Sequence, residues 1–349
     1  MTVEPIHIFG AGLFARALAK ALQAQGRPVA AFLVSGAPPS PQIDDLPCRT
    51  LQAQDLEAAP LWIAAFNHRH DSDYGLLQVQ LLGLNPHARL VWPQEAFGQV
   101  AQAMGFRYWL HPVEDYSKAS SEIAAARARL EDEDSRRTLD DIIRFRSVPG
   151  CFAMPPRPDP DTQYLPSWLR AALQASGRSQ LRIVDGGAYQ GETLRELNEI
   201  VPIAHAWAFE PDPANFKVLA KQQWDYPVEC IAAGLSDAEA QLSFSDGVGE
   251  ASSISEAGAL KVRVCAVDEV LTNAEVNFIK LDIEGHELQA LQGARRTLLR
   301  CRPALAIAAY HRWDDLWQLS SFIASLGLGY RMRLSVHQHN SFETVLFAY

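Results

Sequence analysis

Short apolar runs alternate with segments of helical spacing over two parts of the chain, at its two ends. In the first part, strands and helices are predicted in turn at Pro5–Phe9, Leu13–Gln25, Val29–Val34, Leu61–Phe66, Tyr74–Leu84 and Arg89–Trp92. Such alternation is typical of strand–helix units that build a parallel sheet. We therefore expect a first α/β domain over residues 1–100.

The next part of the chain has a different pattern. Residues Ser117–Phe145 show helical spacing and are rich in Ala, Arg, Glu and Asp, so this stretch is predicted to be helical. The acidic run Glu131–Asp134 is expected on a solvated face or at a helix start. Five prolines in residues 147–162 indicate an extended connector. Residues 101–178 are thus interpreted as a helical bridge and an extended linker.

A second α/β run follows over residues 179–349. Seven strands are predicted at Leu181–Gly186, His205–Glu210, Val228–Leu235, Asn277–Asp282, Pro303–Tyr310, Tyr330–Val336 and Glu343–Tyr349. Helices are predicted between the first six strands, and His337–Ser341 joins the last two as an antiparallel hairpin. The segment Gln241–Val270 interrupts the alternation and carries a further strand at Lys261–Val267. This order predicts a seven-stranded doubly wound sheet.

Composition narrows the class of protein. The 349 residues are 48% hydrophobic and 21% charged, as in a globular protein of about two domains. A net charge of −10 argues against a surface that binds nucleic acid. The five cysteines are scattered, the N-terminus lacks a signal-peptide pattern, and no run approaches the roughly 20 apolar residues of a membrane span. We expect reduced thiols and a cytoplasmic protein.

The strongest local motif is a glycine turn that follows the strand at Leu181–Gly186. Its candidate cofactor-binding residues are Asp185, Gly186, Gly187 and Gly191. Such a turn at the carboxyl end of a strand is where ligands bind in open α/β sheets. Asp185 and Glu192 would repel a pyrophosphate but suit the sulfonium and ammonium of S-adenosylmethionine. The motif favours this methyl donor over a dinucleotide; the alternative is a glycine turn without a ligand.

Two further acids end neighbouring strands. Glu210 follows Gly187 by 23 residues, which suits an acceptor for ribose hydroxyls, although an acid there could also cap a helix. Asp237 could reach the adenine amino group or form a local Asx turn. Both are candidate cofactor-binding residues.

A third polar group lies around the strand Asn277–Asp282. Asp282 and Glu284 follow it, and His311 follows the next strand, so these three are the candidate catalytic residues. His311 could be a general base or one ligand of a divalent metal. That ligand set is incomplete, so no residue is assigned to a metal. Acids at a helix start also serve as caps, and the loop residues His337 and His339 are expected to be inert.

These motifs, in their order and spacing, resemble the FkbM family of S-adenosylmethionine-dependent methyltransferases. The resemblance covers about 181–349 and rests on VDGGAYQG, AFEPDP, AAGLSD and IKLDIEGHELQALQGA; a Tyr-Leu-Pro at 164–166 resembles the family's lead-in segment. It implies a class I methyltransferase fold and methylation of a hydroxyl on a sugar or natural product. It further implies that Asp185, Gly187 and Gly191 hold the methionine end, that Glu210 holds the ribose, and that a signature block lies near the acceptor: Lys280, Asp282, Glu284 and Glu287.

The N-terminal domain has a weaker motif, a GxGxxA turn at Gly10–Ala15. Ser35 and Gly36 stand where an NAD-binding acid is expected, which argues against NAD. A Rossmann-like domain that binds a nucleotide or nucleotide-sugar, with Asn67–Arg69 near a phosphate, and a purely structural unit both stay open.

Together these patterns predict an α/β protein in which a Rossmann-like domain and a helical linker precede a class I methyltransferase domain. The expected function is O-methylation of a small-molecule or glycan acceptor with S-adenosyl-L-methionine as cofactor. The alternative is a non-catalytic nucleotide-sugar binding protein with a degenerate methyltransferase domain.

Overall fold

The computed structural model describes residues 5–245, 253–254 and 260–349. The chain forms two compact units. Unit 1 comprises Met1–Ser121, Arg137–Asp159 and Gln338–Phe342, and unit 2 comprises Glu122–Arg136, Pro160–His337 and Glu343–Tyr349. Each unit is therefore built from segments that are distant in the sequence.

Unit 1 contains a six-stranded sheet of order β3-β4-β2-β1-β5-β6. Only β3 runs antiparallel to its neighbour. The strands are β1 (Ile6–Phe9), β2 (Val29–Val34), β3 (Gln42–Ile43), β4 (Leu46–Thr50), β5 (Leu61–Ile63) and β6 (Leu90–Val91). The helices are α1 (Leu13–Ala24), α2 (Asp55–Ala58), η1 (His70–Ser72), α3 (Tyr74–Leu84), α4 (Pro93–Met104) and α5 (Val113–Lys118), and η2 (His339–Ser341) also belongs to this unit. The predicted alternation is present, with β5 shorter than expected.

The stretch Ser117–Phe145 is helical as predicted, but it is not one continuous helix. Three helices cover this region, namely α5, α6 (Ser120–Arg129) and α7 (Glu133–Ser147). The break between α6 and α7 lies at Leu130, which forms a bridge with Met332. The Glu131 amide also donates to the Met332 carbonyl at 2.8 Å. Asp132 then accepts from the Ser135 amide at 2.7 Å and starts the next helix. A tertiary contact thus overrides continuous helical spacing.

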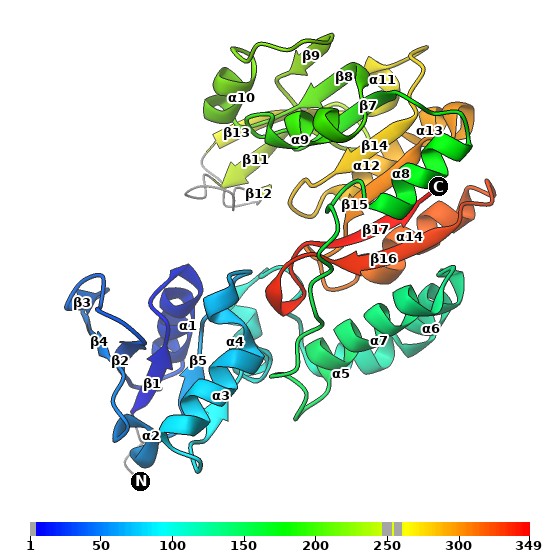
Figure 1. The fold of residues 1–349 in the computed structure, drawn as a ribbon. Coiled ribbons are helices and arrows are strands. Elements are labelled where there is room, and N and C mark those ends of the chain that lie inside the picture. Colours follow the sequence, from blue (N-terminus) through cyan, green and yellow to red (C-terminus); the bar gives the residue numbers. More distant parts are fainter. Residues whose placement is uncertain (1–4, 246–252, 255–259) are drawn as a thin grey trace. The chain divides into compact units, whose positions relative to one another are not determined.

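Unit 2 is built on a seven-stranded sheet of order β16-β17-β15-β14-β7-β8-β9 (Figure 1). The strands are β7 (Leu181–Gly186), β8 (Ile203–Phe209), β9 (Val228–Ile231), β14 (Phe278–Leu281), β15 (Ala304–Ala308), β16 (Met332–Val336) and β17 (Thr344–Ala348). All pairs are parallel except those of β17, which runs antiparallel to both β15 and β16. The predicted doubly wound sheet closed by a hairpin is confirmed.

The predicted strand Val228–Leu235 is divided between two sheets. Its first part is β9, and its second part is β10 (Gly234–Leu235), because the chain turns where the Ala233 amide donates to the Ile231 carbonyl at 2.9 Å. β10 pairs with β13 (Leu260–Cys265) in a four-stranded sheet that also contains β11 (Ala240–Ser245) and β12 (Ser253–Ile254). Strand β13 confirms the one predicted at Lys261–Val267. The rest of the predicted Ser- and Gly-rich turns lies largely outside the described residues.

Helices connect the strands of unit 2. They are α8 (Ser167–Ala175), α9 (Glu192–Ile200), α10 (Pro213–Leu219), α11 (Val267–Val270), α12 (Glu287–Gly293), α13 (Arg295–Cys301) and α14 (Asp315–Ser325). Leu169, Leu173, Leu194 and Leu197 of α8 and α9 are fully or almost fully buried in one apolar core with the sheet residues. In the part of the chain that the structure describes, no helix has both the length and the apolar character needed to cross a membrane.

Gly187 shows how tightly the β7 turn packs on its neighbour. It has φ +73°, and a Cβ on it would lie 1.9 Å from the carbonyl oxygen of Asp282. A residue with a Cβ therefore cannot replace Gly187 unless the backbone after β14 moves. The two turns that follow β7 and β14 are therefore fixed against each other.

Substituting Gly187 should destabilise the protein far more than substituting a glycine that shares only its backbone conformation. Gly177 has φ +79° but nothing within 4 Å of its Cβ position. We expect G177A to lower the free energy of unfolding by about 1 kcal/mol from backbone strain alone. G187A should lower it by about 3 kcal/mol or more, because overpacking adds to the strain. Urea denaturation of both variants is the measurement, and equal losses would contradict the close contact.

Candidate functional site

Four neighbouring strands of unit 2 bring most of the predicted site residues to one edge of the sheet. In the order β15-β14-β7-β8, His311 follows β15, Asp282 follows β14, Asp185 and Gly186 end β7, and Glu210 follows β8. Their side chains are contributed by the carboxyl ends of parallel strands, where open α/β sheets bind ligands. Asp237 is different, since it follows β10 of the other sheet and is exposed, with Oδ1 accepting from Ser236 Oγ at 3.1 Å.

Asp185 lies in a buried ion pair. It is directly opposite Lys280 in the parallel pairing of β7 and β14, and Lys280 Nζ lies 3.0 Å from Asp185 Oδ1. The same ammonium donates to the carbonyls of Gly186 and Gly187 at 3.2 and 2.8 Å. Burial raises the pKa of Asp185, while the charge of Lys280 opposes that change. The pair thus anchors the glycine turn, a role for Lys280 that the sequence did not reveal.

The amides of the glycine turn are already used within the chain. Gly187 and Ala188 both donate to the Phe209 carbonyl at 3.0 Å, and Tyr189 donates to Glu210 Oε2 at 2.9 Å. Gly191 begins the helix that follows with φ +97°, and a Cβ there would lie 2.6 Å from Trp224. This turn therefore links β7 to β8 instead of presenting these three amides to an anion.

Glu210 is 5% exposed and bridges two loops. Besides the Tyr189 amide, it accepts from the Asp212 amide through Oε1 at 2.8 Å. Burial raises the pKa of Glu210 to about 7. The capping of α10 is performed by Asp212, whose Oδ1 accepts from the amides of Ala214 and Asn215. Capping thus does not explain Glu210, and each of its oxygens keeps a further lone pair.

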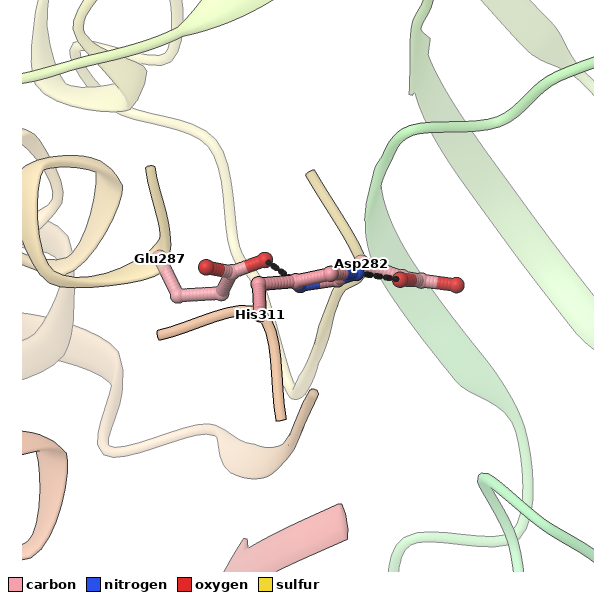
Figure 2. Close-up of side chains that lie close together, drawn as sticks. All are labelled: Asp282, Glu287 and His311. Atoms are coloured by element: carbon pink, nitrogen blue, oxygen red, sulfur yellow. Dashed lines mark hydrogen bonds and ion pairs between the residues drawn. The ribbon is translucent and has the colours of Figure 1, made fainter. Parts of the chain in front are cut away.

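His311 lies among three carboxyl groups, and Figure 2 shows those of Glu287 and Asp282. Nδ1 lies 2.8 Å from Glu287 Oε1, and Nε2 lies 3.4 Å from Asp282 Oδ1 and 3.7 Å from Glu284 Oε2. The His311 and Glu287 side chains are 0% exposed, whereas those of Asp282 and Glu284 are 26% and 24% exposed. The two outer acids are therefore the members of the cluster that a ligand can reach, and the histidine stands behind them.

The protonation states follow from these neighbours. Burial opposes a charge on His311, but Glu287, Glu284 and Asp282 together raise the pKa of His311 well above its usual value. Burial, with repulsion from Asp282 and Glu287, raises the pKa of Glu284 to about 8 despite the proximity of His311. Near neutral pH the cluster thus holds an imidazolium and a protonated Glu284.

Glu284 also has an unusual backbone. Its φ is +57°, a left-handed conformation that is uncommon for a residue with a side chain. Strain of this kind is concentrated at functional sites. The conformation turns the chain between β14 and α12, which lets Glu284 face the same imidazole as Asp282.

A metal centre is the other arrangement that such residues suggest. Ligand atoms of Asp282, Glu287 and His311 lie within 4.8 Å of one another. Figure 2 shows, however, that Glu287 and Asp282 lie on opposite sides of the imidazole ring. An ion on one ring nitrogen would face only one of the two carboxyl groups at the usual distance of about 2 Å. The geometry fits a chain of hydrogen bonds and ion pairs better than a three-ligand site.

Two further residues of this region, Tyr164 and Glu343, had no role predicted from the sequence. Tyr164, in the segment before α8, donates its hydroxyl to Asp282 Oδ2 at 2.7 Å. Glu343 accepts from the Tyr310 hydroxyl at 2.9 Å and from Gln163 Nε2 at 2.5 Å, and its pKa is raised to about 7 by burial and by Asp282. The Tyr-Leu-Pro lead-in was the one sequence signal for Tyr164.

The remaining candidates have local partners. His337 Nε2 lies 3.0 Å from Ser335 Oγ in unit 2. In unit 1, His339 pairs with Asp73 at 2.9 Å, and Asn67 Oδ1 accepts from the Arg69 amide at 2.8 Å. These contacts account for the local conformation of the loops at Asn67–Arg69 and His337–Ser341.

Comparison with known proteins finds similarity to methyltransferases. Residues 185–339 match the family model described as the methyltransferase FkbM domain. A curated relative, the hexuronic acid methyltransferase AglP of Haloferax volcanii, is 32% identical over 103 residues, which are 27% of this chain and 43% of that protein. The chain thus matches less than half the length of this relative.

A solved structure shares the fold over nearly the whole chain. The crystal structure of methyltransferase FkbM from Methylobacillus flagellatus is similar with a TM-score of 0.74, over 99% of this chain and 90% of that one, at 21% identity. With the seven-stranded sheet, this similarity shows that the chain has a class I methyltransferase-like fold, in which residues 185–339 match the FkbM methyltransferase domain model.

Proposed function

We propose that this protein transfers a methyl group from S-adenosylmethionine to a hydroxyl group of a carbohydrate. The observation that carries the proposal is the position of two partly exposed acids, Asp282 and Glu284, in front of a buried imidazolium. This cluster follows β14 and β15, next to the glycine turn that follows β7. Donor and acceptor sites would then share one edge of the sheet.

The residues of the β7 and β8 ends fit the donor. When bound, S-adenosylmethionine would supply a methyl group already activated by the sulfonium. A pyrophosphate would find the amides of Gly187, Ala188 and Tyr189 engaged and the carboxyl group of Glu210 close by. The free lone pairs of Glu210 suit ribose hydroxyls.

The remaining donor contacts follow the family pattern. The turn formed by Asp185, Gly186, Gly187 and Gly191 would hold the methionine end. Asp185 is 0% exposed and paired with Lys280, so it would act mainly by fixing that turn. Asp237 would reach the adenine amino group from its exposed position.

On the acceptor side, Asp282 would take the proton of the attacking hydroxyl. General base catalysis of this kind contributes about 10²–10⁴-fold, and alignment of the two reactants supplies much of the rest. Glu284, protonated near neutral pH, would donate a hydrogen bond to an acceptor oxygen. His311 has Nδ1 on Glu287 and Nε2 toward the outer acids, so it would stabilise Asp282 instead of meeting the substrate.

A carbohydrate acceptor is suggested by the relative. The printed name of AglP says that it methylates a hexuronic acid, and carboxyl groups are common partners of sugar hydroxyls. We therefore propose the hydroxyl of a hexuronic acid or a related sugar as the acceptor.

Removing the base should slow transfer strongly and spare donor binding. We expect D282N to lower kcat about 10²–10⁴-fold, measured as labelled methyl transferred from S-adenosylmethionine to methyl glucuronide and methyl glucoside. The Kd of S-adenosylhomocysteine, measured by calorimetry, should stay within about threefold. D314N is the control, since the Asp314 side chain is similarly exposed at 24%. Full activity of D282N, or no binding of S-adenosylhomocysteine to the wild type, would refute the proposal.

Donor binding should depend on the ionisation of Glu210. Ribose hydroxyls would donate to its carboxylate form, so protonation competes with the ligand. Because the pKa of Glu210 is about 7, the Kd of S-adenosylhomocysteine should increase as the pH falls from 8 to 5.5, by about tenfold per unit below the pKa. E210Q should bind weakly at every pH without this slope. E229Q, which alters the exposed Glu229 of β9, should behave as wild type, and a flat wild-type profile would contradict the assignment.

A further inference from the structure

We infer that Tyr164 is a positioning residue of the methyl-transfer site, which holds one oxygen of Asp282 while Glu287 acts on the other oxygen through His311. The inference rests on the proposed function, in which Asp282 accepts the proton of the acceptor. Tyr164 precedes the residues that match the FkbM family model, which begin at 185. The site would therefore depend on a segment outside the recognised domain.

The Tyr164 side chain is held firmly in place. It is 7% exposed, the neighbouring Leu165 is 0% exposed, and Pro166 begins α8, which packs into the core through Leu169 and Leu173. The Tyr164 ring lies over the Lys280 ammonium, with 5.3 Å between Nζ and the ring centroid. One side chain thus contacts the cation that anchors the glycine turn and the carboxyl group that follows β14.

The Tyr164 hydroxyl acts as a donor. Burial, with the charge of Asp282, raises the pKa of Tyr164 well above its usual value, so the phenol keeps its proton. Its hydrogen bond to Asp282 Oδ2 is 2.7 Å long. A bond to a charged acceptor is stronger than one between neutral groups and favours the ionised carboxylate.

The other oxygen of Asp282 faces the imidazolium. His311 Nε2 lies 3.4 Å from Oδ1, and Glu287 Oε1 accepts from both His311 Nδ1 and the Ile283 amide, at 2.8 and 2.9 Å. Glu287 is thereby tied to the backbone directly after Asp282 and orients the ring. With a hydrogen bond on Oδ2 and an ion pair on Oδ1, both oxygens of the Asp282 carboxyl group are held from within the cluster.

Other charged groups also act on Asp282. They are Glu284 from the same turn, Glu343 at the start of β17, and the pair Asp185 and Lys280 on β7 and β14. None of them donates a hydrogen bond to Asp282 among the described residues. Removing a single hydroxyl from Tyr164 therefore tests its contribution without changing the number of charges.

The experiment is Y164F in the full-length protein, assayed with S-adenosylmethionine and the better of methyl glucuronide and methyl glucoside. We expect kcat to fall about 10–100-fold, with KM for S-adenosylmethionine within about twofold. The loss should fall on kcat and not on KM, because the Asp282 carboxylate that takes the proton loses a donor. A merely structural role would not give this split between kcat and KM.

Y330F is the matched control. The Tyr330 hydroxyl donates to the Pro303 carbonyl before β15, at the opposite end of the strand from His311. This variant should leave both kcat and KM within about twofold of the wild-type values. A kcat of Y164F within about twofold of the wild type, or equal effects of both substitutions, would overturn the inference.

A second readout needs no methyl transfer. The losses of stability in Y164F and D282N should be less than additive in the double variant, because both remove the same bond. In E287Q, the His311 pKa should fall, as measured by NMR titration of labelled histidine with H311Q for assignment. Additive losses would overturn the role of Tyr164, and an unchanged His311 would overturn that of Glu287. If the wild type transfers no methyl group while these results hold, the proposed function fails and the arrangement around Asp282 stands.

Discussion

Two buried cations hold the carboxyl edge of the unit 2 sheet together. Lys280 is 1% exposed and pairs with Asp185, and His311 is 0% exposed and faces three carboxyl groups. A buried ion pair adds little net stability compared with apolar packing, but the loss of one partner costs about 3–5 kcal/mol because a charge stays buried alone. Both the glycine turn after β7 and the turn after β14 that carries Asp282 and Glu284, here called the acidic turn, depend on these contacts.

The sheet itself puts these groups in contact. Parallel pairing of β7 and β14 sets Asp185 opposite Lys280, and the amide of Asp282 donates to the Gly186 carbonyl at 3.1 Å. The chain then turns through Glu284 in a left-handed conformation, a strain of about 1–3 kcal/mol. Such a conformation persists only where its surroundings enforce it, so the acidic turn is shaped by its position between two strands and α12.

Local patterns predicted the parts of the site that lie close together in the sequence. The apolar strands that lead into Asp185, Glu210 and Asp282 could be read directly, because strand ends and glycine turns have short-range signals. Distant partners have no such signal. The bond between Tyr164 and Asp282 joins residues that are 118 positions apart, and only the folded chain brings them together. The roles of Lys280 and Glu287 likewise depend on strand register and on the position of His311.

The same lack of a local signal for distant partners explains where the elements of the fold are divided. The helical spacing of Ser117–Phe145 is continuous, yet the bridge between Leu130 and Met332 interrupts the helix. The apolar run Val228–Leu235 resembles one strand, yet its two halves pair with different sheets. In both regions a contact with a distant strand decides the outcome.

The charge of the site has a consequence for the kind of ligand that it favours. Burial and mutual repulsion raise the pKa of Glu284 to about 8 and that of Glu343 to about 7, so Lys280 and His311 do not fully neutralise the carboxyl groups around them. A positive charge placed near these acids would favour their ionised forms and release protons, whereas a diphosphate would add to the repulsion. The excess of carboxyl groups therefore supports the proposed sulfonium donor over a dinucleotide. This preference comes from the balance of charges on the sheet edge and does not depend on the shape of the glycine turn.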